Sequence, residues 1–498
     1  MQKEEESVIL AQYTIRSKQE YIFRTNRLLE IMGGTEMIRD AFGWVFQAAK
    51  AAGVSVLSAD KADFSLRAVQ AAFADGTLGM AELFCGGGNL TVLYRDAETY
   101  RQVNRRFSRM VLENAPGMVA MAACCEADGR DYAADYRALM DAVDAEKNRM
   151  LPACNTYAAP FALRDRATNQ PIVCRVPYAG GLRELSAESL KKWEKGLASD
   201  KRNAGNRLLD EMTTERQEES LLAIVHADGN NMGIKIQQKL GGRTDYDFCV
   251  NTMRAFTAEI ARVFAETGEA SLQKTMAALQ NGPQKLRESA YRYRVVVSDG
   301  DDFTFICNAR FALRYTADYL QAVQSNPGYS SCAGICIFHS GYPVARAYAL
   351  AEQACDNAKK PVHATCAEEC WLDFHYLHSG IDGDLDNIRS WQKTEALIAR
   401  PWLVQGDSTV FTLPRAEKLV AYICRNRSEG TNRSNLKKFA AALEESPAAA
   451  QRELARILYR NPAFAEALRA FSPCGQEQCK ALYDIAEMYD LWIEERGN

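Results

Sequence analysis

The stretch VVVSDGDDFTFI, residues Val295–Ile306, joins two apolar arms through a short acidic turn. The apolar arms predict two strands that are buried on at least one face of a sheet. The turn therefore presents Asp301 and Asp302 at one end of a hairpin. An Asp-Gly turn is by itself a common hairpin device, so a second acidic stretch is needed before the pair indicates a functional site.

That second stretch is LLAIVHADGNNMG, residues Leu221–Gly233, an apolar strand that ends at Asp228. An acid at a strand end, followed by a glycine, can offer a carboxylate and a backbone carbonyl to a hard cation. Three carboxylates on adjacent strands repel one another, and a divalent cation shared with a polyphosphate relieves that repulsion. We therefore predict that Asp228, Asp301 and Asp302 hold Mg²⁺ (or Mn²⁺) and are the catalytic residues of a nucleotidyltransferase.

The elements around these stretches follow an order that occurs twice. In the second copy we expect strands at 221–227, 294–297, 303–307 and 331–338, and helices at 245–266, 310–324 and 343–359. In the first copy we expect strands at 8–15, in the two arms of 81–94 and at 117–125, and helices at 24–50, 95–114 and 130–148. This order predicts an α+β fold with two palm (ferredoxin-like, βαββαβ) domains, in which helices pack on one face of a mostly antiparallel sheet.

Four regions follow from the changes in pattern along the chain. Residues 1–150 form the first palm-like domain, and residues 151–217 form a proline-containing connector with short extended pieces and a polar helix. Residues 218–385 form the second, catalytic palm domain. Residues 386–498 are rich in helical periodicity and poor in strands, and they predict a helical C-terminal domain.

Composition limits the class of protein and its compartment. The 498 residues are 47% hydrophobic and 25% charged, with a net charge of −4, so general nucleic-acid affinity and direct binding of double-stranded DNA are not expected. Any contact with nucleic acid must come from a local patch or a partner. Fifteen scattered cysteines, no signal-like start and no membrane-length apolar run predict a reduced, cytoplasmic protein without a membrane partner.

The second copy resembles the palm domain of GGDEF-type nucleotidyl cyclases and of the large, polymerase-like subunit of type III CRISPR effector complexes, the Cas-ten family. The resemblance is carried by DGNNMG at 228–233, DGDD at 299–302, CAGI at 332–335, HSGYP at 339–343 and the helix 351–360. The first copy resembles the other palm of that subunit through YIFRTNRL at 21–28, GGTEMI at 33–38 and GGGN at 86–89. Together these motifs span most of residues 8–385.

This chain departs from the family pattern at three places. Asp299 replaces the first glycine of the family's Gly-Gly-Asp-Asp hairpin, and Asn230 stands where many members have a second acid, which leaves one or two metals open. The matching hairpin of the first copy, Gly86–Asn89, has no carboxylate. The first palm is therefore predicted to be non-catalytic, although the resemblance implies that it can hold a second nucleotide.

The resemblance implies ATP as the substrate, joined through 3′–5′ linkages into cyclic oligoadenylate or a related cyclic nucleotide for antiviral defence. It also implies partners among CRISPR RNA–protein complex subunits and target RNA. One alternative is a catalytically silent scaffold subunit that binds nucleotide or RNA. The other is a GGDEF-like cyclase that acts on GTP as a symmetric dimer.

Several further residues are predicted to contact the nucleotide. Gly229, Asn231 and Gly300 adjoin the three acids, and the resemblance implies a phosphate contact for Lys359 or Lys360. A lysine at a helix C-terminus is equally favoured by the helix dipole. In the first palm, Gly34 and Thr35 belong to a Gly-Gly-Thr stretch that either forms a ligand-contacting loop or kinks a helix.

Two other kinds of site are not expected. His363, Cys366, Cys370, His375 and His378 have a zinc-binding composition, but the Cys-x₃-Cys spacing on one helix face favours core packing, so no zinc ligand is predicted. No histidine is followed by aspartate, so an HD nuclease domain is not expected in this sequence.

Overall fold

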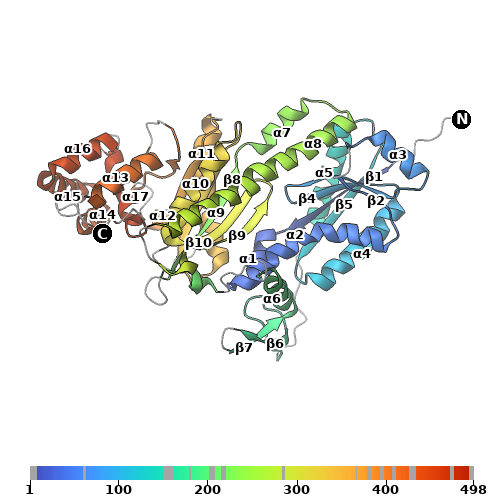
Figure 1. The fold of residues 1–498 in the computed structure, drawn as a ribbon, viewed down its shortest axis with the longest axis horizontal. Helices are drawn as coiled ribbons and strands as arrows, with labels where there is room; N and C mark the ends of the chain where they lie inside the picture. Colours follow the sequence, from blue (N-terminus) through green and yellow to red (C-terminus); the bar gives the residue numbers. More distant parts are fainter. Residues whose placement is uncertain are drawn as a thin grey trace. The chain divides into compact units, whose positions relative to one another are not determined.

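The structure is a computed structural model that describes residues 8–59, 63–149, 161–178, 181–200, 208–214, 220–282, 286–365, 367–377, 383–392, 397–406, 411–425, 433–471 and 476–492. The chain divides into two compact units, Met1–Arg207 with Asn231–Arg262, and Leu208–Asn230 with Val263–Asn498. Each unit contains a mixed, mostly antiparallel sheet with helices on it (Figure 1). The predicted α+β class is confirmed, while the four predicted domain ranges stay a prediction.

The sheet of the first unit follows the predicted βαββαβ order. Its strand order is β2-β3-β4-β1-β5, and only the short β2–β3 pair is parallel. Without the short β2, the order β3-β4-β1-β5 is that of a ferredoxin-like sheet. In such a sheet the first strand of the chain, here β1, lies between the third and the fourth, here β4 and β5. The strands are β1 (Val8–Arg16), β2 (Val56–Leu57), β3 (Met80–Gly86), β4 (Asn89–Tyr94) and β5 (Val119–Ala127).

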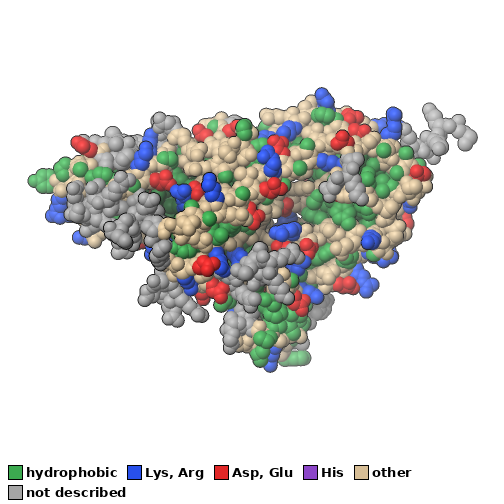
Figure 2. Space-filling view, in the orientation of Figure 1, with side chains coloured by type: hydrophobic (Ala, Val, Ile, Leu, Met, Phe, Trp, Pro, Cys, Tyr) green, Lys and Arg blue, Asp and Glu red, His purple; other side chains and the backbone are tan. Residues whose placement is uncertain are grey.

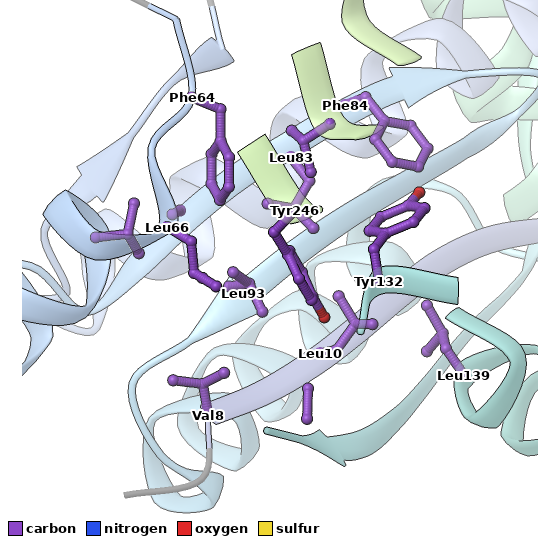
Figure 3. Packing of buried hydrophobic residues seen from close by; sticks show 14 of the residues in the cluster. Val8, Leu10, Phe64, Leu66, Leu83, Phe84, Leu93, Tyr132, Leu139 and Tyr246 are labelled. Carbon is purple, nitrogen blue, oxygen red and sulfur yellow. The ribbon is translucent and has the colours of Figure 1, made fainter. Parts of the chain in front are cut away.

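Helices cover both faces of this sheet, whereas the sequence predicted only one covered face. Ile9 and Ala11 of β1 pack under α2 (Leu28–Ala51) and α4 (Ala97–Asn114), the two helices of the predicted repeat. Val8 and Leu10 point to the other face, where they join a cluster with Tyr132 and Tyr246 (Figure 3). This cluster includes residues of α3 (Leu66–Ala74), α5 (Tyr132–Arg149) and α8 (Tyr246–Ile260). Because β1 is apolar on both sides, one layer of helices cannot bury it.

The glycine pair predicted as a loop or a kink lies inside helix α2. A Cβ atom at Gly33 would lie 1.8 Å from the carbonyl oxygen of Lys192, and one at Gly196 would lie 2.0 Å from that of Leu29. Lys192 and Gly196 belong to α6 (Ala187–Asp200). Gly33 and Gly196 therefore let the backbones of α2 and α6 come into contact. This helix contact explains the glycine at position 33 without a loop or a kink.

Replacing Gly33 with alanine should destabilise the first unit by at least about 1–3 kcal/mol, because the new methyl group meets the backbone of α6 and neither helix can yield locally. Gly43→Ala is the matched control in the same helix. Nothing lies within 4 Å of a Cβ at Gly43, so this change should stabilise by about 0.5–1 kcal/mol. Urea unfolding of the two variants is the measurement, and equal stability would contradict the close helix contact.

The region predicted as a connector contains a two-stranded ribbon and a helix. The ribbon consists of β6 (Ile172–Tyr178) and β7 (Gly181–Ser186), and α6 follows it directly. Val173 and Leu182 are exposed on this ribbon, and hydrophobic side chains gather on its surface (Figure 2). Of the helices that the structure describes, none is long and apolar enough to cross a membrane.

The sheet of the second unit repeats the same topology. Its order is β13-β12-β11-β8-β10-β9, and only the β11–β12 pair is parallel. The order β11-β8-β10-β9 is again ferredoxin-like, so the predicted duplication is confirmed at the level of topology. The strands are β8 (Leu221–Gly229), β9 (Tyr293–Asp299), β10 (Asp302–Asn308), β11 (Ser331–His339), β12 (Trp371–Tyr376) and β13 (Trp402–Leu403).

Helices also cover both faces of the second sheet. On one face Tyr319 of α10 (Ala312–Gln324) stacks on Phe303 of β10, with ring centroids 4.8 Å apart. The other face carries α11 (Val344–Thr365), which approaches closely because β11 has a glycine there. A Cβ at Gly334 would lie 1.9 Å from the carbonyl oxygen of Ala351. The position of α11 is therefore fixed against β11 by backbone contact.

The C-terminal part of the second unit is helical, as predicted. A buried charge network joins it to the sheet, because Arg400 donates to Asp484 at 3.0 Å and also lies 3.5 Å from Asp373 of β12. Strand β12 itself was not predicted. The helices are α12 (Leu385–Trp391), α13 (Leu413–Arg425), α14 (Arg433–Glu445), α15 (Pro447–Arg460), α16 (Pro462–Phe471) and α17 (Gln476–Met488).

Candidate active site

Strands β8 and β10 bring two of the predicted acids to one face of the sheet. The strands are antiparallel, with Thr304 opposite His226, so Asp302 and Asp228 lie at the same end of the ladder. Side chains two residues apart on a strand share a face. His226, Asp228, Asp302 and Thr304 therefore all point to the face that α11 covers.

The third acid lies in the turn and takes another direction. Strands β9 and β10 pair through Asp299 and Asp302, so Gly300 and Asp301 form a two-residue loop. Gly300 has φ +66°, which the first position of a type II′ turn requires. A Cβ at Gly229 would lie 2.8 Å from Asp301 Cβ and 3.0 Å from Asp301 Oδ2. Asp301 thus packs against the end of β8, on the side that Gly229 leaves open.

Burial and charge act differently on these acids. Burial, and after it the neighbouring Asp228 carboxylate, raise the pKa of Asp301 to about 7. Lys359 of α11 donates a hydrogen bond to Asp228 Oδ2. Burial lowers the pKa of Lys359, but the Asp228 carboxylate and, to a lesser extent, the thiols of Cys355 and Cys332 together raise it above its ordinary value. The Lys359 ammonium thus forms an ion pair with the Asp228 carboxylate, at the place where a metal cation is predicted to bind.

Of the two predicted lysines, the structure places only Lys359 at the acids. Its side chain is 14% exposed, whereas Lys360, the next residue on α11, points to solvent. Successive helix residues differ by about 100° in direction, so only one of the two can face the sheet. The phosphate contact itself stays a prediction.

The residues around Asp228 have local structural roles. Asn230 is buried, and its amide nitrogen donates to Ser330 Oγ at 2.9 Å and to the Glu369 carbonyl at 3.1 Å. A carboxylate at this position could not make these donations, which gives a structural reason for asparagine where many members of the resembled family have an acid. Asn231 has φ +61° and begins α7 (Met232–Leu240). Asparagine tolerates this conformation better than most residues.

The hairpin of the first unit is a turn without acids. Gly87 and Gly88 have φ +57° and +72°, as a type I′ turn requires, and the Asn89 amide donates to the Gly87 carbonyl at 3.0 Å. Gly34 and Thr35 lie within α2 and are buried, and the Thr35 hydroxyl donates to the Ile31 carbonyl at 3.2 Å. Their predicted contact with a nucleotide stays a prediction.

The stretch with zinc-binding composition is divided between different elements. The expected helix across its two cysteines is wrong, because α11 ends at Thr365 and Cys370 precedes β12. Cys370 is buried and accepts from the Ser331 backbone at 3.4 Å, as core packing predicts. His375 is buried in β12, where burial and the nearby Arg400 and Arg389 guanidinium groups lower its pKa to about 3. Cys366 and His378 lie outside the described residues.

The donor set at the acids suits a hard divalent cation by its chemistry. It consists of carboxylates at strand ends, one of which already holds an ammonium while another has a raised pKa. Among the described residues, however, no group of three or more His, Cys, Asp or Glu side chains converges as metal ligands would. Asp301 lies in the turn and packs against Gly229 at the end of β8, whereas Asp228 and Asp302 point to the face that α11 covers.

Sequence reasoning overlooked one polar residue at this site. His226 is 7% exposed, and its Nδ1 atom lies 3.4 Å from Asp302 Oδ1. Its position two residues before Asp228, in an otherwise apolar strand, could have indicated it, since such residues share a face.

A βαββαβ sheet with acids at the ends of its first strand and its central hairpin is the arrangement that the sequence predicted for a palm domain. Residues 221–364 match the family model described as Cas10/Cmr2, second palm domain. This region is therefore a Cas10/Cmr2-type second palm, as the sequence motifs predicted. No curated protein matches the chain.

Solved structures share the fold over nearly the whole chain. A Csm1–Csm4 cassette in complex with cA4 has a TM-score of 0.51 and is 11% identical, covering 97% of this chain and 70% of that chain. The cassette with cA3 has a TM-score of 0.51 and is 12% identical, covering 98% and 70%. Csm1 in T. onnurineus has a TM-score of 0.51 and is 13% identical, covering 97% and 69%. At these identities the similarity establishes the fold.

Proposed function

We propose that the chain is a palm-type nucleotidyltransferase that joins ATP into cyclic oligoadenylate or a related cyclic nucleotide signal in CRISPR-type antiviral defence. The observation that carries this proposal is the pairing of Lys359 with Asp228 beside Asp301, whose pKa is raised to about 7. Carboxylates crowded at strand ends beside a lysine can hold a cation, which in turn binds the negative charge of a triphosphate. The match of this region to the Cas10/Cmr2 second palm supports the same reading.

In this proposal Asp228, Asp301 and Asp302 hold Mg²⁺ or Mn²⁺. The metal supplies neutralisation of the triphosphate charge and a lower pKa for the attacking hydroxyl. Lys359 lies on the acids and can donate to a phosphate oxygen. Gly229 leaves room for Asp301 at the end of β8, and the Gly300 turn fixes where that acid sits.

The first unit and the partners complete the proposal. The first palm holds a second nucleotide without contributing a carboxylate, and the chain acts with CRISPR RNA–protein subunits and target RNA. The solved structures of similar fold include Csm1 in complex with Csm4 and with cA4 or cA3, which is consistent with such partners. The described cysteines are free thiols, which fits the cytoplasm.

A catalytically silent subunit that binds nucleotide or RNA is the second candidate. It is favoured by one observation, that the acids among the described residues do not converge as a three-ligand group. Incubation with each labelled nucleoside triphosphate and Mg²⁺ or Mn²⁺, followed by product analysis, separates the candidates. Cyclic products from ATP support the proposal and products from GTP indicate a GGDEF-like cyclase. Binding without pyrophosphate release under any activation supports the silent subunit.

Nucleotide binding is expected to depend on a divalent metal, because the three carboxylates would otherwise face the triphosphate with like charge. Calorimetric titration with ATP, in Mg²⁺ and then in EDTA, is the measurement. We expect affinity to fall by at least about tenfold in EDTA, which corresponds to about 1.4 kcal/mol. Undiminished ATP affinity in EDTA would overturn the metal assignment.

The hairpin of the first palm is expected to tolerate loss of its polar side chain but not of its turn glycine. Asn89→Ala should leave metal binding unchanged, because Asn89 only donates to the Gly87 carbonyl. A bulky residue at Gly88 should disturb the turn, since φ +72° strains any β-branched side chain. Metal titrations and thermal unfolding of Asn89→Ala and Gly88→Val test this. Loss of metal binding in Asn89→Ala alone would contradict it.

A further inference from the structure

The side chains of Asp302, Thr304 and His226 form a series of polar contacts on the face of the sheet that α11 covers. Thr304 Oγ1 donates to Asp302 Oδ1 at 3.3 Å, and His226 Nδ1 lies 3.1 Å from Thr304 Oγ1. Thr304 is fully buried and His226 nearly so. The proposed metal chemistry uses Asp302 but leaves His226 and Thr304 without a role.

The direction of these hydrogen bonds follows from the threonine hydroxyl. It has one proton, so donation to Asp302 leaves its lone pairs to accept from the Nδ1–H of His226. The imidazole stands edge-on to the Tyr348 ring of α11, with centroids 5.5 Å apart and an interplanar angle of 76°. Packing against this ring limits the rotation of His226. This series of hydrogen bonds therefore fixes the Asp302 carboxylate from the face of the sheet that α11 covers.

A purely structural explanation fits these residues less well. His226 and Thr304 face each other across the ladder, and the next pair on the same face, away from the acids, is the apolar Ile224 and Ile306. An apolar pair would fill that space at lower desolvation cost, and buried polar groups stabilise only when every partner is satisfied. The polar chain ends on Asp302 at the strand terminus, which is where the proposed function needs a fixed carboxylate.

We propose that His226 and Thr304 are positioning residues that hold the Asp302 carboxylate in one rotamer for the metal and the triphosphate. This inference rests on the proposed function, because it gives Asp302 the role of a ligand. Asp302 Oδ1 accepts the hydrogen bond from Thr304, and Oδ2 remains available to bind the metal. Partners of this kind around metal ligands alter metal affinity or activity by about 10–100-fold when they are removed.

The test compares Thr304→Val, which keeps the shape but removes the hydroxyl, with Thr304→Ser, which keeps the hydroxyl. The first readout is Mn²⁺ affinity by calorimetry without nucleotide, and the second is pyrophosphate release with ATP. Thr304→Val should weaken Mn²⁺ binding by about 10–100-fold and lower kcat more than it changes KM. Thr304→Ser should stay within about threefold of wild type, and the melting temperatures should differ little.

A second pair of variants, at His226, keeps the test conclusive if one of the Thr304 variants fails to fold. Asparagine at position 226 places an amide nitrogen near the position of Nδ1, so His226→Asn should retain Mn²⁺ affinity and His226→Leu should lose it. Wild-type affinity in Thr304→Val, or equal losses in Thr304→Val and Thr304→Ser, would overturn the positioning role alone. A wild-type protein that binds no Mn²⁺ would overturn the proposed function and this inference with it.

Discussion

Replacing Asp301 with asparagine is expected to raise the melting temperature of the metal-free protein and to lower nucleotidyl transfer by more than about a hundredfold. Burial and the adjacent Asp228 carboxylate already hold the pKa of Asp301 at about 7, so its ionised form is disfavoured in the folded state. Asparagine removes that charge and keeps the shape. Loss of a direct metal ligand should exceed the 10–100-fold effect of losing a residue that only supports one.

The stability gain should depend on pH in a defined direction. Below the ordinary aspartate pKa the acid is protonated in the folded and unfolded states, so Asp301→Asn changes little. As pH rises toward 7, the unfolded chain ionises first, and the wild-type protein loses stability relative to the variant. Thermal unfolding in EDTA at pH 5 and pH 8 should therefore show a larger gain at pH 8.

Asp302→Asn is the matched comparison, because Asp302 accepts from Thr304 and lies 3.4 Å from His226 Nδ1. We expect this variant to lose activity without gaining stability. Activity retained in the Asp301→Asn, Asp302→Asn double variant would show that the acids only form a turn. Loss of activity with a lowered melting temperature for Asp301→Asn would instead indicate misfolding.

Replacing Lys359 with methionine is expected to weaken ATP binding by about 10–100-fold and to destabilise the metal-free protein. A lysine that donates to a phosphate contributes about 1.5–3 kcal/mol, which sets the size of the effect on binding. Methionine also leaves Asp228 beside Asp301 without a cation. Since the pair is only partly buried, the expected loss of stability is about 1–3 kcal/mol, between the values for surface and buried pairs.

Lys360→Met is the control, because Lys360 is exposed and follows Lys359 directly on α11. Calorimetry with ATP and Mg²⁺ and thermal unfolding in EDTA should show a full effect at Lys359 and little at Lys360. Equal effects of the two changes would indicate a general loss of positive charge. An unchanged ATP affinity in Lys359→Met would remove the lysine from the proposed site.

The sequence predicted most of the two sheets because their strands carry local signals. The apolar run 221–227 corresponds to β8, and the acidic hairpin corresponds to β9 and β10, each within a few residues. The double occurrence of one element order predicted the shared strand order of the two units. Strand β12 was missed, because the segment just before it was interpreted as a helix across Cys366 and Cys370, whereas α11 ends at Thr365 and β12 begins at Trp371.

What the sequence determined by itself is therefore the βαββαβ topology and the placement of acids at the end of its first strand and in its hairpin, since periodicity, turn glycines and motif spacing are local properties. The tertiary structure alone decided which lysine faces Asp228, that Asp301 and Asp302 have different partners, and that Gly33 belongs to a helix contact. These features depend on strand register and on which helix packs on which face. Such contacts join residues far apart in the chain, so no local pattern encodes them.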